Sequence, residues 1–159
     1  MVTKKKSRRA SRKKLARRPP RAGRQQRQQR QQPESLRLRS MAASLTVHDL
    51  ERSIAWYRDV LRFVVGERWE EGGKVRGVQM KAGACDLMLT QDDFAKGRDR
   101  QKGEGFRLWV ATVQDITELA GRVKAMGWRL DREPSETPWG DWAFGLTDPD
   151  GFKLTILQE

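Results

Sequence analysis

The sequence predicts an α+β protein in which one β-α-β-β-β unit occurs twice. The order strand, helix and three strands is found over residues 36–90 and again over residues 106–157. The letters repeat too, because Thr46–Leu50 (TVHDL) matches Thr112–Ile116 (TVQDI). A charged, glycine-spaced segment at residues 92–105 separates the two units. One unit is too small for a stable core, so we expect the two units to share one.

The first unit opens with alternating apolar residues over 36–47, which predict a strand. Asp49 is a favourable helix N-cap, and apolar residues follow it at helical spacing. These residues are Leu50, Ile54, Tyr57 and Leu61. Three further strands are expected at 63–69, 75–81 and 85–90, joined by turns at Gly72-Gly73 and Ala82-Gly83.

The second unit repeats this order, beginning with an apolar strand at 106–113. Asp115 caps the next helix and Glu118 completes a capping box. The helix's buried stripe is expected to consist of Ile116, Leu119, Val123 and Met126. Further strands are expected at 128–133, 142–147 and 152–157, the last two joined by a β-turn at the DPDG sequence, residues 148–151.

Positive charge is concentrated at the N-terminus. Residues 1–40 hold 16 Lys and Arg and one acidic residue, Glu34, in a chain of net charge +12, and they contain no aromatic residue. We therefore expect a disordered basic arm at 1–34 and a folded domain at 35–159, with units at about 35–91 and 104–159. Such an arm attracts phosphate backbones without sequence specificity, so nucleic acid is one candidate partner.

Other composition features concern the compartment. The sequence has no apolar run of membrane-spanning length, so no membrane partner is expected. One cysteine, Cys85, cannot form an internal disulfide and suits a reducing cytoplasm, which is the expected location. We expect its thiol to be buried and inert.

Three segments in combination resemble the vicinal oxygen chelate superfamily, which includes glyoxalase I, bleomycin-resistance proteins and extradiol dioxygenases. They are residues 44–63 (SLTVHDLERSIAWYRDVLRF), residues 104–127 and residues 137–159, which contain DPDG and a final strand. Arg62 departs from the pattern, because the family usually has Gly before this Phe. The resemblance implies the glyoxalase/bleomycin-resistance fold, in which paired βαβββ modules form a cup-shaped curved sheet around a ligand.

Metal-using members of this superfamily hold the metal with four side chains, mostly His and Glu, on the first and last strands of each unit. An alignment on the two helix caps and the DPDG turn puts these positions at Ala42, Met88, Leu108 and Thr155. None of the four suits a hard divalent cation, and the single histidine, His48, lies beyond its strand. We therefore expect no metal and no other cofactor.

Side chains that point into the cup should share the facing of these four positions, because strand side chains alternate. On this basis Trp109 should pack beneath the helix, opposite to Leu108. Two tryptophans that precede or begin a late strand offer flat faces for stacking on an aromatic or cationic ligand. The expected ligand-binding residues are Thr46, Asp86, Met88, Phe106, Leu108, Trp139, Trp142 and Thr155.

The function predicted first is metal-independent binding of a small molecule, close to the bleomycin-resistance branch, by a homodimer with no catalytic residue. The resemblance leaves open a glyoxalase-like lyase, isomerase or dioxygenase with atypical metal ligands. A third alternative is a nucleic-acid-associated protein tethered by residues 1–34.

Overall fold

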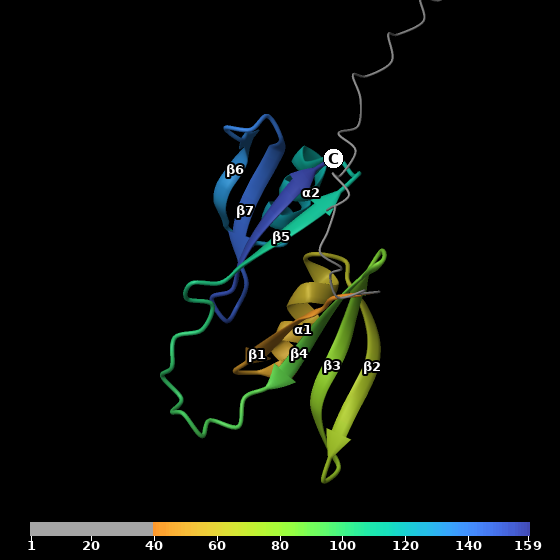
Figure 1. The fold of residues 1–159 in the computed structure, drawn as a ribbon, viewed down its shortest axis with the longest axis vertical. Helices are drawn as coiled ribbons and strands as arrows, with labels where there is room; N and C mark the ends of the chain where they lie inside the picture. The colour runs from red at the N-terminus through yellow and green to blue at the C-terminus, as the bar shows by residue number, and fades with distance from the viewer. Residues whose placement is uncertain (1–39) are drawn as a thin grey trace, which may run out of the picture. The chain divides into compact units, whose positions relative to one another are not determined.

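The computed structural model describes residues 40–159, and Figure 1 shows their two β-α-β-β-β units. The first unit comprises β1 (Ala43–Val47), α1 (Leu50–Asp59), β2 (Val64–Glu71), β3 (Lys74–Ala82) and β4 (Cys85–Gln91). The second comprises β5 (Arg107–Thr112), α2 (Ile116–Ala125), β6 (Leu130–Glu136), β7 (Trp142–Thr147) and β8 (Lys153–Gln158). The predicted α+β order is confirmed, whereas the expected basic arm lies outside the described residues.

Each unit forms its own four-stranded sheet, with the order β1-β4-β3-β2 in the first and β5-β8-β7-β6 in the second. The first strand of each unit runs parallel to the last, and the other neighbours are antiparallel. The helix between the first two strands packs on one face of its own sheet (Figure 1). We call the opposite face of each sheet its open face.

One hydrophobic cluster includes residues from both units, as the size of a single unit predicts. Leu45 and Val47 of β1 and Leu154 and Ile156 of β8 contribute to it from the helix-covered faces of their sheets. Between the units, the rings of Trp56 and Trp128 meet edge-on, with 5.4 Å between their centroids.

Several boundaries differ from the predicted ones. Strand β1 begins at Ala43, and residues 36–39 of the expected strand lie outside the described part of the chain. Met126 is 53% exposed because it is the C-cap of α2 and no longer on its buried stripe. Cys85 is exposed at the start of β4, so the expectation of a buried thiol is wrong. No helix within residues 40–159 is long and apolar enough to cross a membrane.

The connection between the first strand and the helix is one residue longer in the second unit. Matching backbone hydrogen bonds, Asp92 N to Val47 O and Glu159 N to Thr112 O, show that Val47 corresponds to Thr112. The helix caps that correspond are Asp49 and Asp115. Only His48 separates strand from cap in the first unit, whereas Val113 and Gln114 do so in the second. The letter match TVHDL with TVQDI therefore misaligns the strands by one residue.

This extra residue reverses the facing that was predicted for β5. Leu108 and Val110 pack against the hydrophobic core, while Arg107 and Trp109 point to the open face. The predictions that Leu108 lines the cup and that Trp109 lies beneath the helix are both wrong, because a shift of one residue exchanges the two faces of a strand.

The DPDG sequence forms the predicted β-turn. The backbone N–H of Gly151 donates to the carbonyl of Asp148 at 3.1 Å, and Gly151 has a φ of 96°. The segment between the units packs closely on this turn. A Cβ at Gly103 would collide with the backbone of Gly151, so the approach requires glycine.

Candidate ligand-binding site

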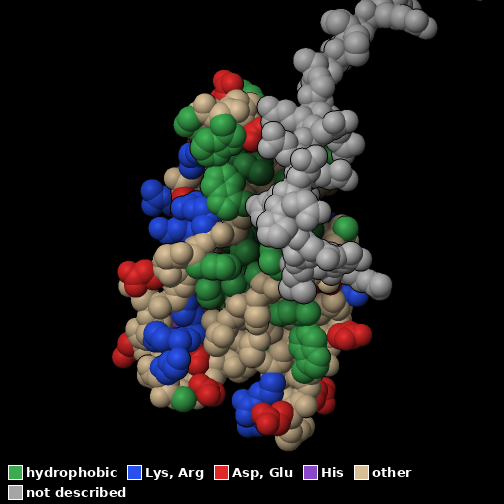
Figure 2. All heavy atoms as spheres, viewed as in Figure 1, with side chains coloured by type: hydrophobic (Ala, Val, Ile, Leu, Met, Phe, Trp, Pro, Cys, Tyr) green, Lys and Arg blue, Asp and Glu red, His purple; other side chains and the backbone are tan. Residues whose placement is uncertain are grey.

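The open face of the sheet β5-β8-β7-β6 holds a pocket of about 360 Å³. Strand β5 supplies Arg107 and Trp109, and β8 supplies Thr155. The remaining lining residues are Asp131 and Arg132 of β6 and Gly145 of β7. Hydrophobic side chains gather over these strands, with Lys and Arg side chains beside them at the β6 edge (Figure 2). The pocket thus joins apolar and positively charged surface.

The guanidinium of Arg107 is held in place by a residue of the sheet on which it lies. Its Nη1 donates a hydrogen bond of 3.0 Å to Oγ1 of Thr155, a buried side chain on the neighbouring strand. Arg107 is also the neighbour in register of Lys153, so two cations lie side by side on this face. Among the described residues that line the pocket, Asp131 is the only carboxylate, and it accepts a hydrogen bond of 2.6 Å from the Thr147 hydroxyl.

Gly145 forms the floor of the pocket. It lies between Thr155 and Arg132 in the sheet register and carries no side chain to cover either. A Cβ built there would lie 3.6 Å from the Cβ of Arg132 and 3.8 Å from the carbonyl of Leu154. These distances are ordinary van der Waals contacts, so the space above Gly145 is open. The packing of the protein does not require a glycine at this position.

Trp109 forms the apolar side of the pocket, and Trp139 lies next to it. Trp109 is 55% exposed and Trp139, in the β6–β7 loop, is 59% exposed. Their ring centroids are 5.7 Å apart, at an interplanar angle of 51°. Exposed indole pairs offer a flat, apolar surface for a planar ligand.

The other predicted site residues occupy three different surroundings. Thr46, Asp86 and Met88 lie partly buried on strands of the first sheet, with the opposite facing to the core residues of those strands, and so reach its open face. Phe106 precedes β5 and packs edge-on against Phe152. Trp142 has the same facing as the core residue Phe144, and is half-exposed at the end of β7. Of the predicted set, only Thr155 lines the pocket, and Trp139 lies beside the lining residue Trp109.

The metal-ligand positions implied by the family resemblance must be moved by one residue in β5. The strand correspondence replaces Leu108 with Arg107 and leaves Ala42, Met88 and Thr155. A permanently charged guanidinium repels a cation, and neither Ala, Met nor Thr supplies a strong ligand for a hard divalent ion. Within residues 40–159, no three His, Cys, Asp or Glu side chains gather in a metal-binding arrangement. These residues do not fit a metal centre of the family type.

Sequence reasoning missed Arg107, Trp109 and the β6 residues Asp131 and Arg132. A usable signal was present in β5 itself, because its aliphatic residues Leu108 and Val110 alternate with Arg107, Trp109 and Ala111. Aliphatic residues on one face and a charge on the other indicate which face is buried. The bulges between β6 and β7 leave no comparable signal for Asp131 and Arg132.

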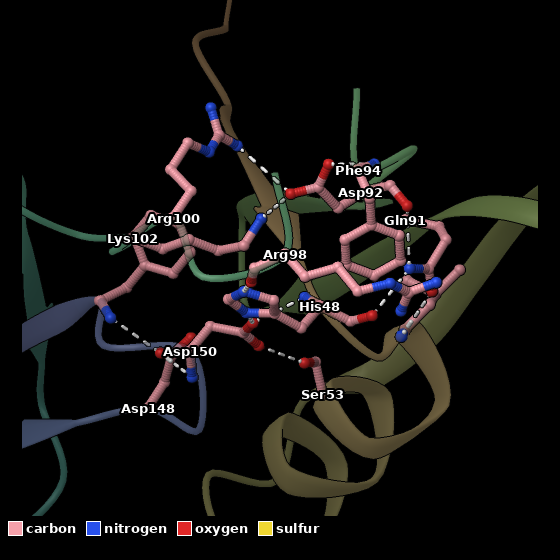
Figure 3. A network of polar contacts seen from close by, with 12 residues as sticks. His48, Ser53, Gln91, Asp92, Phe94, Arg98, Arg100, Lys102, Asp148 and Asp150 are labelled. Carbon is pink, nitrogen blue, oxygen red and sulfur yellow. Dashed lines mark hydrogen bonds and ion pairs between the residues drawn. The ribbon is translucent and has the colours of Figure 1, made fainter. Parts of the chain in front are cut away.

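A second polar cluster lies where the two units meet, and Figure 3 shows it. His48 donates through its backbone N–H to Oδ1 of Asp150 at 2.6 Å, and its Nδ1 lies 2.7 Å from the same oxygen. The hydroxyl of Ser53 donates to Oδ2 of Asp150 at 2.9 Å. Since Ser53 and His48 both bind the carboxylate and not each other, no histidine activates the serine as a nucleophile. Asp150 instead ties the turn of the second unit to the first unit.

Two further contacts complete this junction. Lys102, whose side chain is 2% exposed, pairs with Asp92, and Arg100 approaches the same carboxylate at 3.3 Å (Figure 3). The hydrogen bond from Lys102 lowers the pKa of Asp92 to about 2. The hydroxyl of Tyr57 donates to Oδ2 of Asp148 at 2.9 Å. Burial raises the pKa of Tyr57 and also that of Asp148. These groups have a structural role at the junction.

Comparison with known proteins gives one matching family model and several solved structures of similar fold. A family model described as the glyoxalase/bleomycin resistance protein/dioxygenase superfamily matches residues 39–156. No curated protein matches the sequence significantly. Similar solved structures include TioX from Micromonospora sp. ML1, at 20% identity and a TM-score of 0.62, covering 75% of this chain and 97% of that one.

Two more solved structures show the same fold. TnmS3, an antibiotic-binding protein from Streptomyces sp. CB03234, is 20% identical with a TM-score of 0.61, covering 79% of this chain and 98% of its own. A superfamily member from Sphaerobacter thermophilus DSM 20745 is 22% identical with a TM-score of 0.63, covering 76% and 96% of the two chains.

Proposed function

The chain belongs to the glyoxalase/bleomycin resistance protein/dioxygenase superfamily, and we propose that within it this protein binds a small organic molecule without a metal ion. The observation that carries the proposal is the composition of the pocket on the second sheet. Guanidinium, hydroxyl and indole groups line it, and Arg107 occupies a position at which the family resemblance implies a metal ligand in metal-using members. A concave site with an apolar wall and a few placed polar groups suits a small organic ligand.

One similar solved structure supports the proposal that the protein binds a small molecule. TnmS3 is an antibiotic-binding protein, so the fold that it shares with this chain can hold a small organic compound. The described residues that line the pocket include no His, Cys, Ser or Lys, and their carboxylate, Asp131, accepts a hydrogen bond from Thr147. The proposed ligand is therefore held and released unchanged.

The experiment that tests this function is a ligand screen on protein that has been incubated with Mn, Fe, Ni and Zn and then desalted. We expect no stoichiometric metal by plasma mass spectrometry, and saturable quenching of tryptophan fluorescence by at least one compound class. Trp109 and Trp139 border the pocket, so binding there changes their emission. One metal per chain, together with turnover of a glyoxalase or dioxygenase substrate, would contradict the proposal.

We also propose that two copies of the chain form a homodimer. A pocket on one sheet encloses only one side of a ligand, whereas small-molecule sites bury most of the ligand surface. A second copy laid over Trp109 and Trp139 would supply the missing wall and cover these exposed indoles. Sedimentation equilibrium should give twice the chain mass, and Trp139→Glu should give the single chain mass. A monomeric wild-type protein would overturn this proposal.

For residues 1–34 we propose weak, non-specific attachment to nucleic acid, supported only by their density of Lys and Arg. The full chain should bind duplex DNA with an affinity that falls steeply with salt. Replacing eight of these basic residues with Gln should abolish that binding and leave the thermal unfolding midpoint unchanged. Equal DNA binding by the two proteins would show that the arm is not responsible.

A further inference from the structure

The charges in the pocket allow its ligand to be described more closely. Two arginines, Arg107 and Arg132, line the pocket against one carboxylate, Asp131. Among residues 40–159, neither arginine forms an ion pair with an acidic side chain. Lys153 lies beside Arg107 in the sheet register and adds a third cation. Like charges on adjacent strands destabilise a sheet unless a counter-charge is supplied.

Asp131 does not fully supply that counter-charge. Its Oδ2 accepts the hydrogen bond of Thr147, and no ion pair links it to either arginine in the described part of the chain. The pocket therefore has an excess of positive charge. An anionic group on the ligand would balance this excess.

The geometry favours a planar anion. The guanidinium of Arg107 is fixed through Nη1 by its hydrogen bond to Thr155, which leaves its other N–H groups available to a ligand. A guanidinium fork matches the two oxygens of a carboxylate and binds it through paired hydrogen bonds. A guanidinium fixed in this way matches the planar shape of a carboxylate better than a mobile lysine does.

The remainder of the pocket favours an aromatic ring. Trp109 lines the pocket with Trp139 next to it, and Gly145 leaves open space above the sheet. A flat ring can lie over Gly145 and against Trp109 while its acid group reaches Arg107. We infer that this pocket takes an aromatic carboxylate, held by Arg107 and Arg132 and stacked on Trp109. The inference rests on the proposed small-molecule function and names the ligand class.

The test compares three probes of one shape by isothermal titration calorimetry on the full chain: 2-naphthoate, 2-naphthamide and 2-naphthylmethylamine. The acid should bind at least about tenfold more tightly than the neutral amide, because charged hydrogen bonds to the arginines stabilise only the anion. The amine should bind weakest of the three. Equal or tighter binding of the amide or amine would overturn the inference.

Variants locate the binding and separate it from attraction to the basic N-terminus. Arg107→Gln and Arg132→Gln should each weaken naphthoate binding about tenfold and leave amide binding unchanged. Arg129→Gln removes the same charge from an exposed position outside the pocket and should change neither affinity. If all three variants lose affinity equally, the acid binds by general charge and the inference fails.

One further variant distinguishes failure of this inference from failure of the proposed function. Gly145→Val fills the pocket floor and should abolish binding of all three probes while the protein stays folded, as circular dichroism would show. If neutral or cationic aromatics bind and are blocked by this variant, the small-molecule function stands and the carboxylate assignment fails. If no compound of the wider screen binds at all, both fail.

Discussion

Arg107 has a single side-chain hydrogen-bond partner within its own unit, the hydroxyl of Thr155. That contact fixes the guanidinium before any ligand arrives, which lowers the entropic cost of binding. Thr155 contributes no charge of its own, so it acts by positioning Arg107.

Thr155→Val should therefore weaken 2-naphthoate binding about threefold to tenfold, the range expected for one hydrogen bond. Binding of 2-naphthamide should not change, because the shape of the pocket is kept. Calorimetric titration with both probes measures this difference. An equal loss for the acid and the amide would mean that Thr155 supports the pocket wall and does not position Arg107.

The pair formed by Asp92 and Lys102 predicts a loss of stability in acid. In the unfolded chain the carboxyl of Asp92 has a pKa of about 3.9, whereas in the folded protein its pKa is about 2. Between these values the unfolded chain binds more protons, so stability is full above pH about 4 and falls as the pH approaches about 2. Asp148, with its raised pKa, contributes in the opposite direction.

The double variant Asp92→Asn/Lys102→Met should remove this part of the acid dependence without leaving a buried unpaired charge, because Arg100, which also contacts Asp92, is partly exposed. Urea unfolding at pH 7, 4 and 3 should show a smaller decline for the variant than for the wild type. Parallel decline in both proteins would show that other carboxylates cause the acid sensitivity.

Tyr57 predicts a second pH dependence, at the alkaline end. Its hydroxyl is buried against Asp148, and its pKa lies above that of an unfolded tyrosine, about 10. The stability that it contributes is therefore present below pH 10 and lost as the pH rises above that value. Tyr57→Phe should cost about 1–3 kcal/mol at pH 7, since a buried carboxylate loses one donor. Urea unfolding should show a smaller difference in the free energy of unfolding between the variant and the wild type at pH 10.5 than at pH 7. The same difference at both pH values would contradict this prediction.

At the scale of the elements, the length of the β5–α2 connection decides which residues reach the pocket. Val113 is 84% exposed, so its side chain contributes little to packing. Its presence, however, sets Arg107 and Trp109 on the open face. Removing one residue here would turn the charged face of β5 toward the core.

Deleting Val113 should therefore destabilise the protein by about 3 kcal/mol or more, because Arg107 would be buried without a partner or β5 would be displaced. Val113→Ser, the control, should change stability by less than about 0.5 kcal/mol. Thermal unfolding of both variants measures the contrast. If the deletion is tolerated as well as the substitution, connection length does not determine the facing of β5.

Element order was predictable from the sequence because it depends on local signals. The caps Asp49 and Asp115 and the Gly151 turn each act within a few residues. The facing of β5 was predicted wrongly, because a letter match cannot show where the one extra residue lies. Most of the pocket lining other than Thr155 was missed for the same reason, and because the β6–β7 bulges place Asp131 and Arg132 in a way that strand alternation does not describe.

At the scale of the whole molecule, the two units are joined by one hydrophobic cluster and by the junction around Asp150 and Asp148. The pocket lies on the second unit, away from the cluster, and contains none of the junction residues. Ligand affinity and protein stability should therefore respond to different substitutions.

The most direct test of the account is calorimetric titration of chelator-treated protein with 2-naphthoate, repeated with added Zn²⁺ and Mn²⁺. We predict one ligand per chain, the same affinity with and without metal, and no binding to the Gly145→Val variant. Binding that requires an added divalent cation, or that persists when Gly145 is replaced, would contradict a metal-independent site on the β5-β8-β7-β6 sheet.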